Sequence, residues 1–199
     1  MSVLVTQQAP DFTAAAVLAN GEIVDNFTLS QFKGKKIVLF FYPLDFTFVC
    51  PSEILAHHSR VAAFKEKGVE VVGVSVDSQF THNAWRNTAP ADGGLGTIDF
   101  PLVADTDHAI MEAYGIVHPA GIALRGSFLI DAEFTVRHQV VNDLPLGRDV
   151  DEMLRMVDAL DFHTQNGEVC PAGWKKGDEG MQDTPQGVAK YLAKNADKL

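Results

Sequence analysis

Two continuous apolar runs of strand length constrain this chain more than any other feature. "IVLFFYP" at residues 37–43 and "VEVVGVSV" at residues 69–76 lack the strict polar–apolar alternation of a half-exposed strand. Such runs are typical of strands buried on both faces, as in sheets covered by helices. The segment after the first run, "PSEILAHHSRVAAFKEKG", has Pro51 in its first turn and Gly68 at its end, which predicts a helix. This alternation indicates an α/β fold.

The remaining segments extend the same arrangement. Turn residues Asn20–Gly21 predict a hairpin near the N-terminus. Further along, the patterns predict a helix capped by Asp77 or Ser78, a strand at 100–105, a helix at 106–115, a β-hairpin at 126–141 and an amphipathic helix at 147–163. We therefore expect a mixed central sheet flanked by helices over residues 1–163, followed by a C-terminal extension arm over residues 164–199 with a weak helix near Val188–Ala196.

Composition excludes several classes of protein. The formal net charge of −10 and the lack of a large basic cluster argue against a nucleic-acid partner. The longest apolar run is too short to cross a bilayer, and the first residues, "MSVLVTQQAPDF", lack the features of a secretory signal. Two cysteines in 199 residues do not form a disulfide scaffold, so we expect a reducing, cytoplasmic location without a membrane partner.

Cys50 lies where a short loop meets the predicted helix that begins near Pro51. Helix N-termini present unpaired N–H groups and a partial positive charge, and both favour a thiolate, the nucleophilic form of cysteine. A buried structural thiol is the alternative, and position alone leaves the two nearly even. Glu53 lies three residues later and would disfavour a thiolate unless an arginine is held nearby.

The stretch "PLDFTFVC" matches the Pro-x-x-x-Thr-x-x-Cys motif of the peroxiredoxins, and it resembles the typical two-cysteine class that includes bacterial alkyl hydroperoxide reductase C components. The resemblance extends over essentially the whole chain. Its further pieces, in the family's order, are "APDF" at 9–12, "GVEVVGVSVDS" at 68–78, "HNAW" at 82–85, "GGLG" at 93–96, "RGSFLID" at 125–131 and "GEVCPAGW" at 167–174.

The resemblance implies a thioredoxin-like fold and thiol-dependent reduction of peroxides, with no metal or organic cofactor. Cys50 would be the peroxidatic cysteine and would become a sulfenic acid. Thr47 would hydrogen-bond the peroxide and the thiolate, while Pro43 would shield the site from water. Arg125 would supply a fixed positive charge to the sulfur, and Glu53 would orient its guanidinium group.

Cys170 follows Cys50 by 120 residues and lies on the arm. A second thiol can condense with a sulfenic acid to form a disulfide. By resemblance, Cys170 would do so with Cys50 of a partner subunit, which requires a homodimer; the family commonly assembles such dimers into decamers. The disulfide would then be reduced by a thioredoxin or by a dedicated flavoprotein disulfide reductase, and the sequence does not distinguish the two.

Two other functions remain open from the sequence. A redox-regulated holdase chaperone, as a main or additional activity, is compatible with the acidic surface and the arm. A generic thiol–disulfide oxidoreductase is disfavoured because Glu53 stands where a Cys-x-x-Cys loop would have its second cysteine.

Three weaker signals accompany the motif. "GGLG" at 93–96 lacks the Gly-Lys-Ser/Thr of a phosphate-binding loop, so we expect a flexible loop. In oxidation-sensitive members of the family this loop pairs with a Tyr-Phe motif on the last helix, but this chain has Tyr191-Leu192 there, which puts that sensitivity in doubt. Adjacent helix residues such as His57 and His58 point about 100° apart, so we expect packed or solvated side chains and not a shared metal site.

Overall fold

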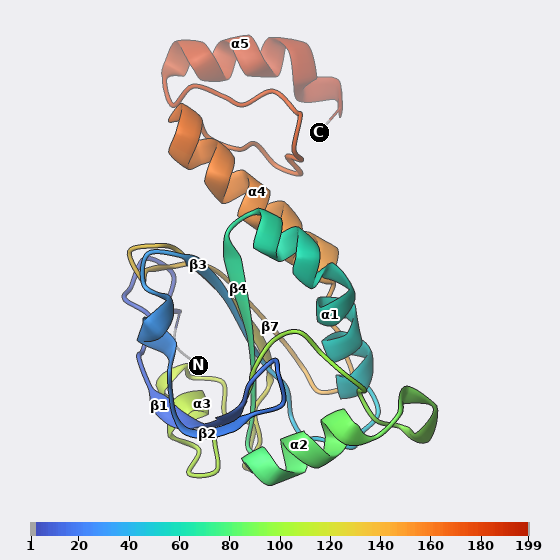
Figure 1. Ribbon diagram of the computed structural model, residues 1–199. Helices are drawn as coiled ribbons and strands as arrows, with labels where there is room; N and C mark the ends of the chain where they lie inside the picture. Colours follow the sequence, from blue (N-terminus) through green and yellow to red (C-terminus); the bar gives the residue numbers. More distant parts are fainter. Residues whose placement is uncertain (1–2, 199) are drawn as a thin grey trace. The chain divides into compact units, whose positions relative to one another are not determined.

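The structure is a computed structural model that describes residues 3–198 (Figure 1). It divides into two compact units, Met1–Val150 and Asp151–Leu199. The expected boundary between residues 163 and 164 lies inside a helix, α4 (Val150–Asn166), so the division of the chain at that point stays a prediction. None of the described helices combines the length and apolar character that a membrane span requires.

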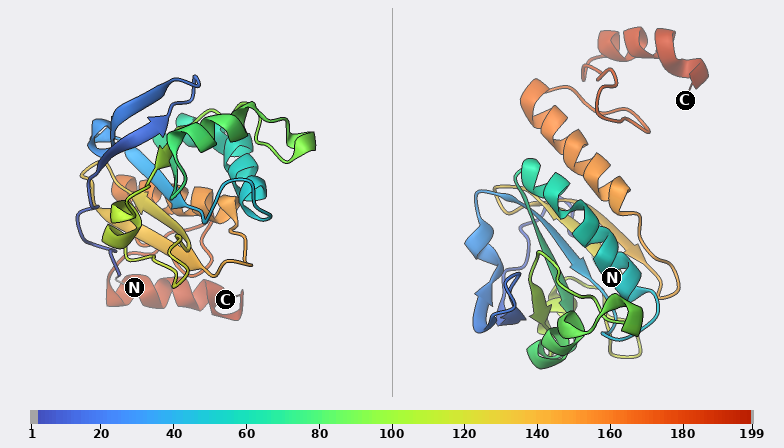
Figure 2. Two further views of the ribbon diagram at one scale, coloured as in Figure 1. Left: turned by 90° about the horizontal axis from the view of Figure 1, so that it is seen from below. Right: turned by 45° about the vertical axis from the view of Figure 1, so that its right-hand side comes forward.

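The first unit is built on a mixed sheet of seven strands in the order β2-β1-β5-β4-β3-β6-β7 (Figures 1 and 2). β3 and β4 pair in parallel, as do β4 and β5, whereas the other neighbours are antiparallel. The strands are β1 (Thr13–Val17), β2 (Ile23–Thr28), β3 (Lys36–Phe41), β4 (Val69–Ser75), β5 (Leu102–Ala104), β6 (Arg125–Ile130) and β7 (Val136–Asn142). The mixed sheet expected from the sequence is therefore confirmed.

Both apolar runs lie at the centre of this sheet, which explains their lack of alternation. Successive side chains of a strand point to opposite faces. Phe40 stacks on His57 of α1 (Cys50–Glu66) with ring centroids 4.0 Å apart, while the neighbouring Phe41 packs against Tyr114, which follows α3 (Ala109–Ala113), at 5.2 Å. Because helical segments cover both faces, the five positions of β3 after Lys36 are buried and apolar.

Local signals fix the ends of the helices. Ser78 caps α2 (Gln79–Asn87) by accepting a hydrogen bond from the Thr81 N–H at 3.2 Å, so one of the two expected caps is used. In the second unit, α5 (Pro185–Asn195) begins three residues before the expected helix. Thr184 accounts for this earlier start because its hydroxyl accepts from the Gly187 N–H at 3.0 Å, and Pro185 suits a first turn.

The second unit, Asp151–Leu199, comprises most of α4, an extended segment and α5. An isolated bridge joins Val169 to Met181, and the rings of Phe162 and Trp174 pack with centroids 4.8 Å apart. Arg155 of α4 donates to the Trp174 carbonyl at 2.7 Å. These contacts tie the segment that contains Cys170 to the α4 helix of the same unit.

Candidate active site

Cys50 is the first residue of α1 and follows the loop that leaves the carboxyl end of β3. Its side chain is 1% exposed. Pro51 occupies the first turn, where its missing N–H has no intrahelical partner to lose. The sulfur therefore lies at a helix N-terminus, as the sequence predicts, where N–H groups and the helix dipole favour negative charge.

Two donors contact the sulfur. The Thr47 hydroxyl lies 3.0 Å from Cys50 Sγ, and Arg125 Nη1 lies 3.4 Å from it. The same hydroxyl lies 2.8 Å from the carbonyl oxygen of Leu44. A hydroxyl carries one proton, so the Leu44 carbonyl and the sulfur compete for it, and a charged sulfur is the stronger acceptor.

Glu53 and Arg125 form a buried ion pair beside the thiol. Arg125, the first residue of β6, donates from Nη1 to Glu53 Oε2 at 2.7 Å and from Nε to the Leu144 carbonyl at 2.7 Å. The side chains of Glu53 and Arg125 are 2% and 4% exposed. The structure thus brings together four residues predicted from the sequence, namely Cys50, Thr47, Glu53 and Arg125.

Arg148 is a second cation that the sequence interpretation did not include. Its Nε and Nη2 atoms lie 2.8 and 3.0 Å from the Glu53 carboxylate, and its backbone N–H donates to the same group at 2.9 Å. Burial alone would raise the pKa of Glu53, but hydrogen bonds and charge from Arg148, with Arg125 adding to them, lower it below its ordinary value. Charge balance could have indicated this second cation from the sequence, because a carboxylate beside a thiolate needs more than one positive charge nearby to offset the two negative charges.

His57 lies one turn beyond Glu53 and is also buried. Its Nδ1 atom is 2.7 Å from the Glu53 carbonyl oxygen. Burial, helped by the positive charge of Arg148, lowers the pKa of His57 to about 3, so the ring is neutral. The neighbouring His58 accepts instead from the Asp99 N–H at 3.3 Å. The two rings therefore have different partners, and within residues 3–198 no cluster of three or more His, Cys, Asp or Glu side chains suits a metal ion.

Pro43 is buried in the loop between β3 and α1, and its shielding role stays a prediction. Cys170 lies in the second unit as a half-buried free thiol, and Cys50 is also free. Cys170 Sγ faces an acceptor, the Ala159 carbonyl oxygen at 3.4 Å. Burial raises the pKa of Cys170, and the charge of Arg155 only partly opposes this shift. The two sulfurs thus have opposite surroundings, since Cys50 faces donors and Cys170 faces an acceptor.

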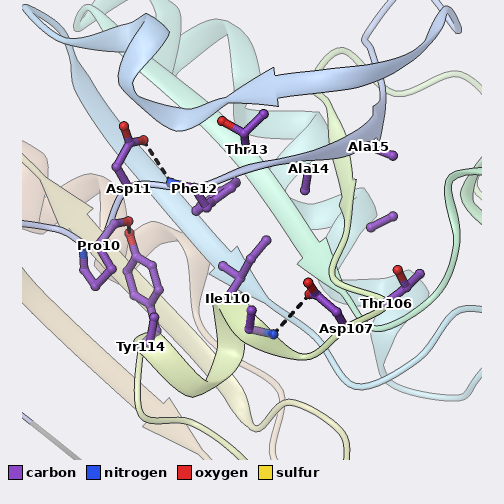
Figure 3. A pocket seen from close by; sticks show the side chains of 13 residues that line it. Pro10, Asp11, Phe12, Thr13, Ala14, Ala15, Thr106, Asp107, Ile110 and Tyr114 are labelled. Atoms are coloured by element: carbon purple, nitrogen blue, oxygen red, sulfur yellow. Dashed lines mark hydrogen bonds between the residues drawn. The ribbon is translucent and has the colours of Figure 1, made fainter.

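Two further features do not belong to the thiol site. A pocket of about 250 Å³ opens between the start of β1 and α3, lined by side chains that include Phe12, Ile110 and Tyr114, and it contains neither cysteine (Figure 3). The Gly93–Gly96 loop is tied to α2 by the Trp85 indole, which donates to the Gly93 carbonyl at 2.9 Å. A Cβ atom at Gly94 would collide with the Thr88 backbone, so close packing explains this glycine without a phosphate ligand.

The fold and the site together define a class of protein: a thioredoxin-like α/β protein with a buried thiol at a helix N-terminus. The AhpC/TSA family model matches residues 5–139, and the model for the C-terminal domain of 1-Cys peroxiredoxin matches residues 159–194. The chain belongs to the AhpC/TSA family of peroxiredoxins, which confirms the resemblance predicted from its motifs.

Individual relatives agree with this assignment. Alkyl hydroperoxide reductase C of Helicobacter pylori strain J99 is 57% identical over 198 residues, covering 99% of this chain and 100% of the relative. The protein of the same name from Buchnera aphidicola of Acyrthosiphon pisum is 57% identical over 194 residues, covering 96% and 98%. The reduced 2-Cys peroxiredoxin of Plasmodium vivax superposes with a TM-score of 0.94 at 44% identity, covering 96% and 100%.

Proposed function

We propose that this chain is a thiol-dependent peroxidase that reduces hydrogen peroxide and organic hydroperoxides through Cys50. The observation that carries the proposal is the buried Cys50 sulfur, held at the start of α1 by the Thr47 hydroxyl at 3.0 Å and by Arg125 at 3.4 Å. These are the contacts that a nucleophilic thiolate requires, and they use neither a metal nor an organic cofactor.

In the first step, the Cys50 thiolate attacks the hydroxyl oxygen of the hydroperoxide. An S–O bond forms, the O–O bond breaks, and the leaving alkoxide or hydroxide takes a proton to become an alcohol or water, while Cys50 becomes a sulfenic acid. Arg125 stabilises the negative charge that moves onto the leaving oxygen. Thr47 hydrogen-bonds the peroxide, Pro43 keeps water from the site, and Glu53 holds the guanidinium group in place.

In the second step, the Cys170 thiol condenses with the Cys50 sulfenic acid of a partner subunit and releases water. The contrast between the two sulfurs supports this division of roles, because a thiol that faces an acceptor reacts more slowly with peroxide than one that faces donors. A dimer also suits β7, which ends the sheet order and so offers an edge for pairing. The disulfide is then reduced by a thioredoxin or by a flavoprotein disulfide reductase.

The same proposal includes a homodimer with an intersubunit disulfide, assembled as a decamer in the cytoplasm. Residues 1–163 would form the enzymatic domain, and residues 164–199 would form the arm that brings Cys170 to the partner. Full-length matches to proteins named 2-Cys peroxiredoxin support the dimer; ring size and reductant rest on the family resemblance alone.

Rapid mixing with peroxide tests the proposal. Reduced protein should lose one thiol per chain in a phase whose rate is proportional to peroxide concentration, and Cys50→Ser should abolish that phase. On a non-reducing gel, peroxide should produce a dimer band that disappears in Cys50→Ser and in Cys170→Ser. Retention of the rapid phase in Cys50→Ser would refute the role of Cys50, and a dimer band in Cys170→Ser would refute the role of Cys170.

A further inference from the structure

A buried hydrogen-bond network surrounds Asp45, which lies in the loop between β3 and α1, five residues before Cys50. Asp45 Oδ1 accepts from the Tyr42 hydroxyl at 2.9 Å, and Asp45 Oδ2 lies 2.7 Å from His82 Nδ1 of α2. The side chains of Asp45 and His82 are 1% and 0% exposed. Burying an aspartate–histidine pair this deeply carries a desolvation cost, and the reaction steps described above give the pair no role.

The protons of this pair follow from its neighbours. His82 Nε2 lies 3.2 Å from the Val103 carbonyl oxygen, which can only accept, so Nε2 carries a proton. One further proton lies between His82 Nδ1 and Asp45 Oδ2. The pair is therefore neutral overall whichever atom holds that proton. An asparagine at position 45 could reproduce the geometry, since its amide would donate to Nδ1 and its carbonyl would accept from Tyr42.

The backbone of Asp45 is held as firmly as its side chain. The Asp45 N–H donates to Asp77 Oδ2 at 2.8 Å, and the Ser75 hydroxyl donates to the same oxygen at 2.8 Å. This N–H and the Leu44 carbonyl belong to one planar peptide group, so fixing the direction of the N–H also fixes that of the carbonyl. The Leu44 carbonyl is the group that the Thr47 hydroxyl contacts at 2.8 Å, and that hydroxyl also contacts Cys50 Sγ.

We call the hydrogen-bonded side chain and N–H of Asp45 the Asp45 anchor. The next residue has an energetically unfavourable backbone conformation. Phe46 has a φ of 52°, in the left-handed region that non-glycine residues rarely occupy. Such a conformation persists only where the surroundings hold it. Here the Asp45 anchor precedes it, and the Phe46 ring packs on Trp85 with centroids 5.6 Å apart, although the side chain is 51% exposed. The strained residue thus lies between the buried anchor and Thr47.

Cys50 is 1% exposed, so the turn that holds it must unwind before the sulfur can form a disulfide with Cys170 of a partner subunit. We propose that Asp45, through His82 and Tyr42, is a positioning residue that orients the Leu44–Asp45 peptide for Thr47 and marks the end of the segment that unwinds. This inference rests on the proposed peroxidase function. Residues up to Asp45 stay in place when the loop opens, and residues 46–49 move. Weakening the anchor therefore has two opposite effects: peroxide attack slows because Thr47 is misplaced, and disulfide formation quickens because the loop opens more readily.

Stopped-flow tryptophan fluorescence of the reduced full-length protein separates these two steps, since only the first depends on peroxide concentration. Asp45→Ala should slow the first step by about 10- to 100-fold, the range expected when a reacting group is misplaced by about 1 Å. The second step should become faster. Asp45→Asn, which keeps both hydrogen bonds, should keep both rates within about threefold of the wild type.

Asp131→Ala is the matched control. Asp131 is also nearly buried and accepts hydrogen bonds from the Thr135 N–H and from Arg137, but it follows the end of β6 opposite to Arg125. It should lower the thermal midpoint and leave both rates unchanged. If Asp45→Ala does not fold, judged by circular dichroism, Tyr42→Phe carries the test, because it removes one donor to Asp45 and should slow the first step by several-fold.

Three results would overturn the inference: unchanged rates in folded Asp45→Ala or Tyr42→Phe, equal losses in Asp45→Ala and Asp45→Asn, or the same loss in Asp131→Ala. The first result would show that Asp45 does not position Thr47. The second would show that the lost rate comes from the charge of the carboxylate and not from its hydrogen bonds. The third would show that the lost rate comes from a general loss of stability. A wild-type protein without a peroxide-dependent phase would instead refute the proposed function, so the two failures are distinguishable.

Discussion

Replacing Arg148 with methionine should destabilise the protein strongly, and mainly above the pH at which Glu53 ionises. The Glu53 carboxylate is 2% exposed and receives side-chain hydrogen bonds from Arg148 at 2.8 and 3.0 Å. Removing one partner of a buried ion pair typically costs about 3–5 kcal/mol in the free energy of unfolding. Because Arg125 still pairs with Glu53 at 2.7 Å, we expect the lower end of that range, about 3 kcal/mol at pH 7.

The pH dependence gives this prediction a second readout. In the wild type the pKa of Glu53 is lowered, chiefly by Arg148 against the effect of burial, so its stabilising contribution is present above the unfolded pKa and is lost as pH falls through the folded pKa. Without the Arg148 side chain, burial is opposed by Arg125 and by the backbone N–H of residue 148, and the pKa of Glu53 should shift upward. Protonation then relieves the penalty, so the difference between wild type and Arg148→Met should shrink as pH falls from 7 towards 4.

Urea denaturation at fixed protein concentration measures both quantities, because oligomers have concentration-dependent stability. Lys194→Met is the control: Lys194 pairs with Glu179, their side chains are 56% and 50% exposed, and such surface pairs contribute only about 0–1 kcal/mol. Glu53→Gln should recover part of the loss when combined with Arg148→Met. Our reasoning is wrong if Arg148→Met costs no more than Lys194→Met, or if its cost is the same at pH 7 and pH 4.

Three further changes have defined outcomes. Thr47→Val should slow Cys50 oxidation by about 100-fold, as loss of a preorganised donor typically does, whereas Thr47→Ser should keep most of the rate in stopped-flow assays; equal rates in both would contradict the role of the hydroxyl. Because burial raises the pKa of Cys170 above its ordinary value, the rate of disulfide formation should rise with pH between pH 6 and 8, and a flat profile would contradict this. His57 has its pKa lowered to about 3, so the unfolded chain takes up a proton below pH 6.5 that the folded chain does not. Stability should therefore fall by about 2 kcal/mol between pH 7 and 5, and His57→Gln should lose that part of the dependence in urea titrations.

The order of strands and helices could be predicted because it depends on local patterns. The apolar runs at 37–43 and 69–76 had to be central strands, and turn and cap residues set most boundaries. Sheet order is different: β5 lies between β1 and β4, and β6 lies next to β3, and no local pattern specifies such pairings between distant segments. The family resemblance implied a thioredoxin-like fold, and the strand order itself was not predicted.

The residues of the candidate site also divide into those that the sequence predicts and those that only the folded chain reveals. Cys50, Thr47 and Glu53 share one stretch of sequence, and the motif led to Arg125. Arg148 stayed hidden because 95 residues separate it from Glu53, and only the folded chain brings them together. The Asp45–His82 pair was equally invisible. Aspartate is mostly exposed in proteins and histidine is intermediate, and the burial of this pair depends on how α2 packs beside the loop that precedes Cys50.

In the proposed reaction, the contacts that hold the Cys50 sulfur also explain why its oxidation would favour opening of the loop. Thr47 and Arg125 donate to the sulfur, and such bonds are roughly twice as strong when the acceptor is charged. Attack on peroxide converts the thiolate into a neutral sulfenic acid, so both donors lose the charge that they stabilised. The two sulfurs of a disulfide lie about 2.05 Å apart. Because Cys50 is 1% exposed, its sulfur cannot come this close to a sulfur of another chain unless the first turn of α1 moves. Under the proposed function, oxidation would therefore weaken the contacts that hold the loop at the step where the loop must open, and the strained Phe46 backbone would favour the same movement.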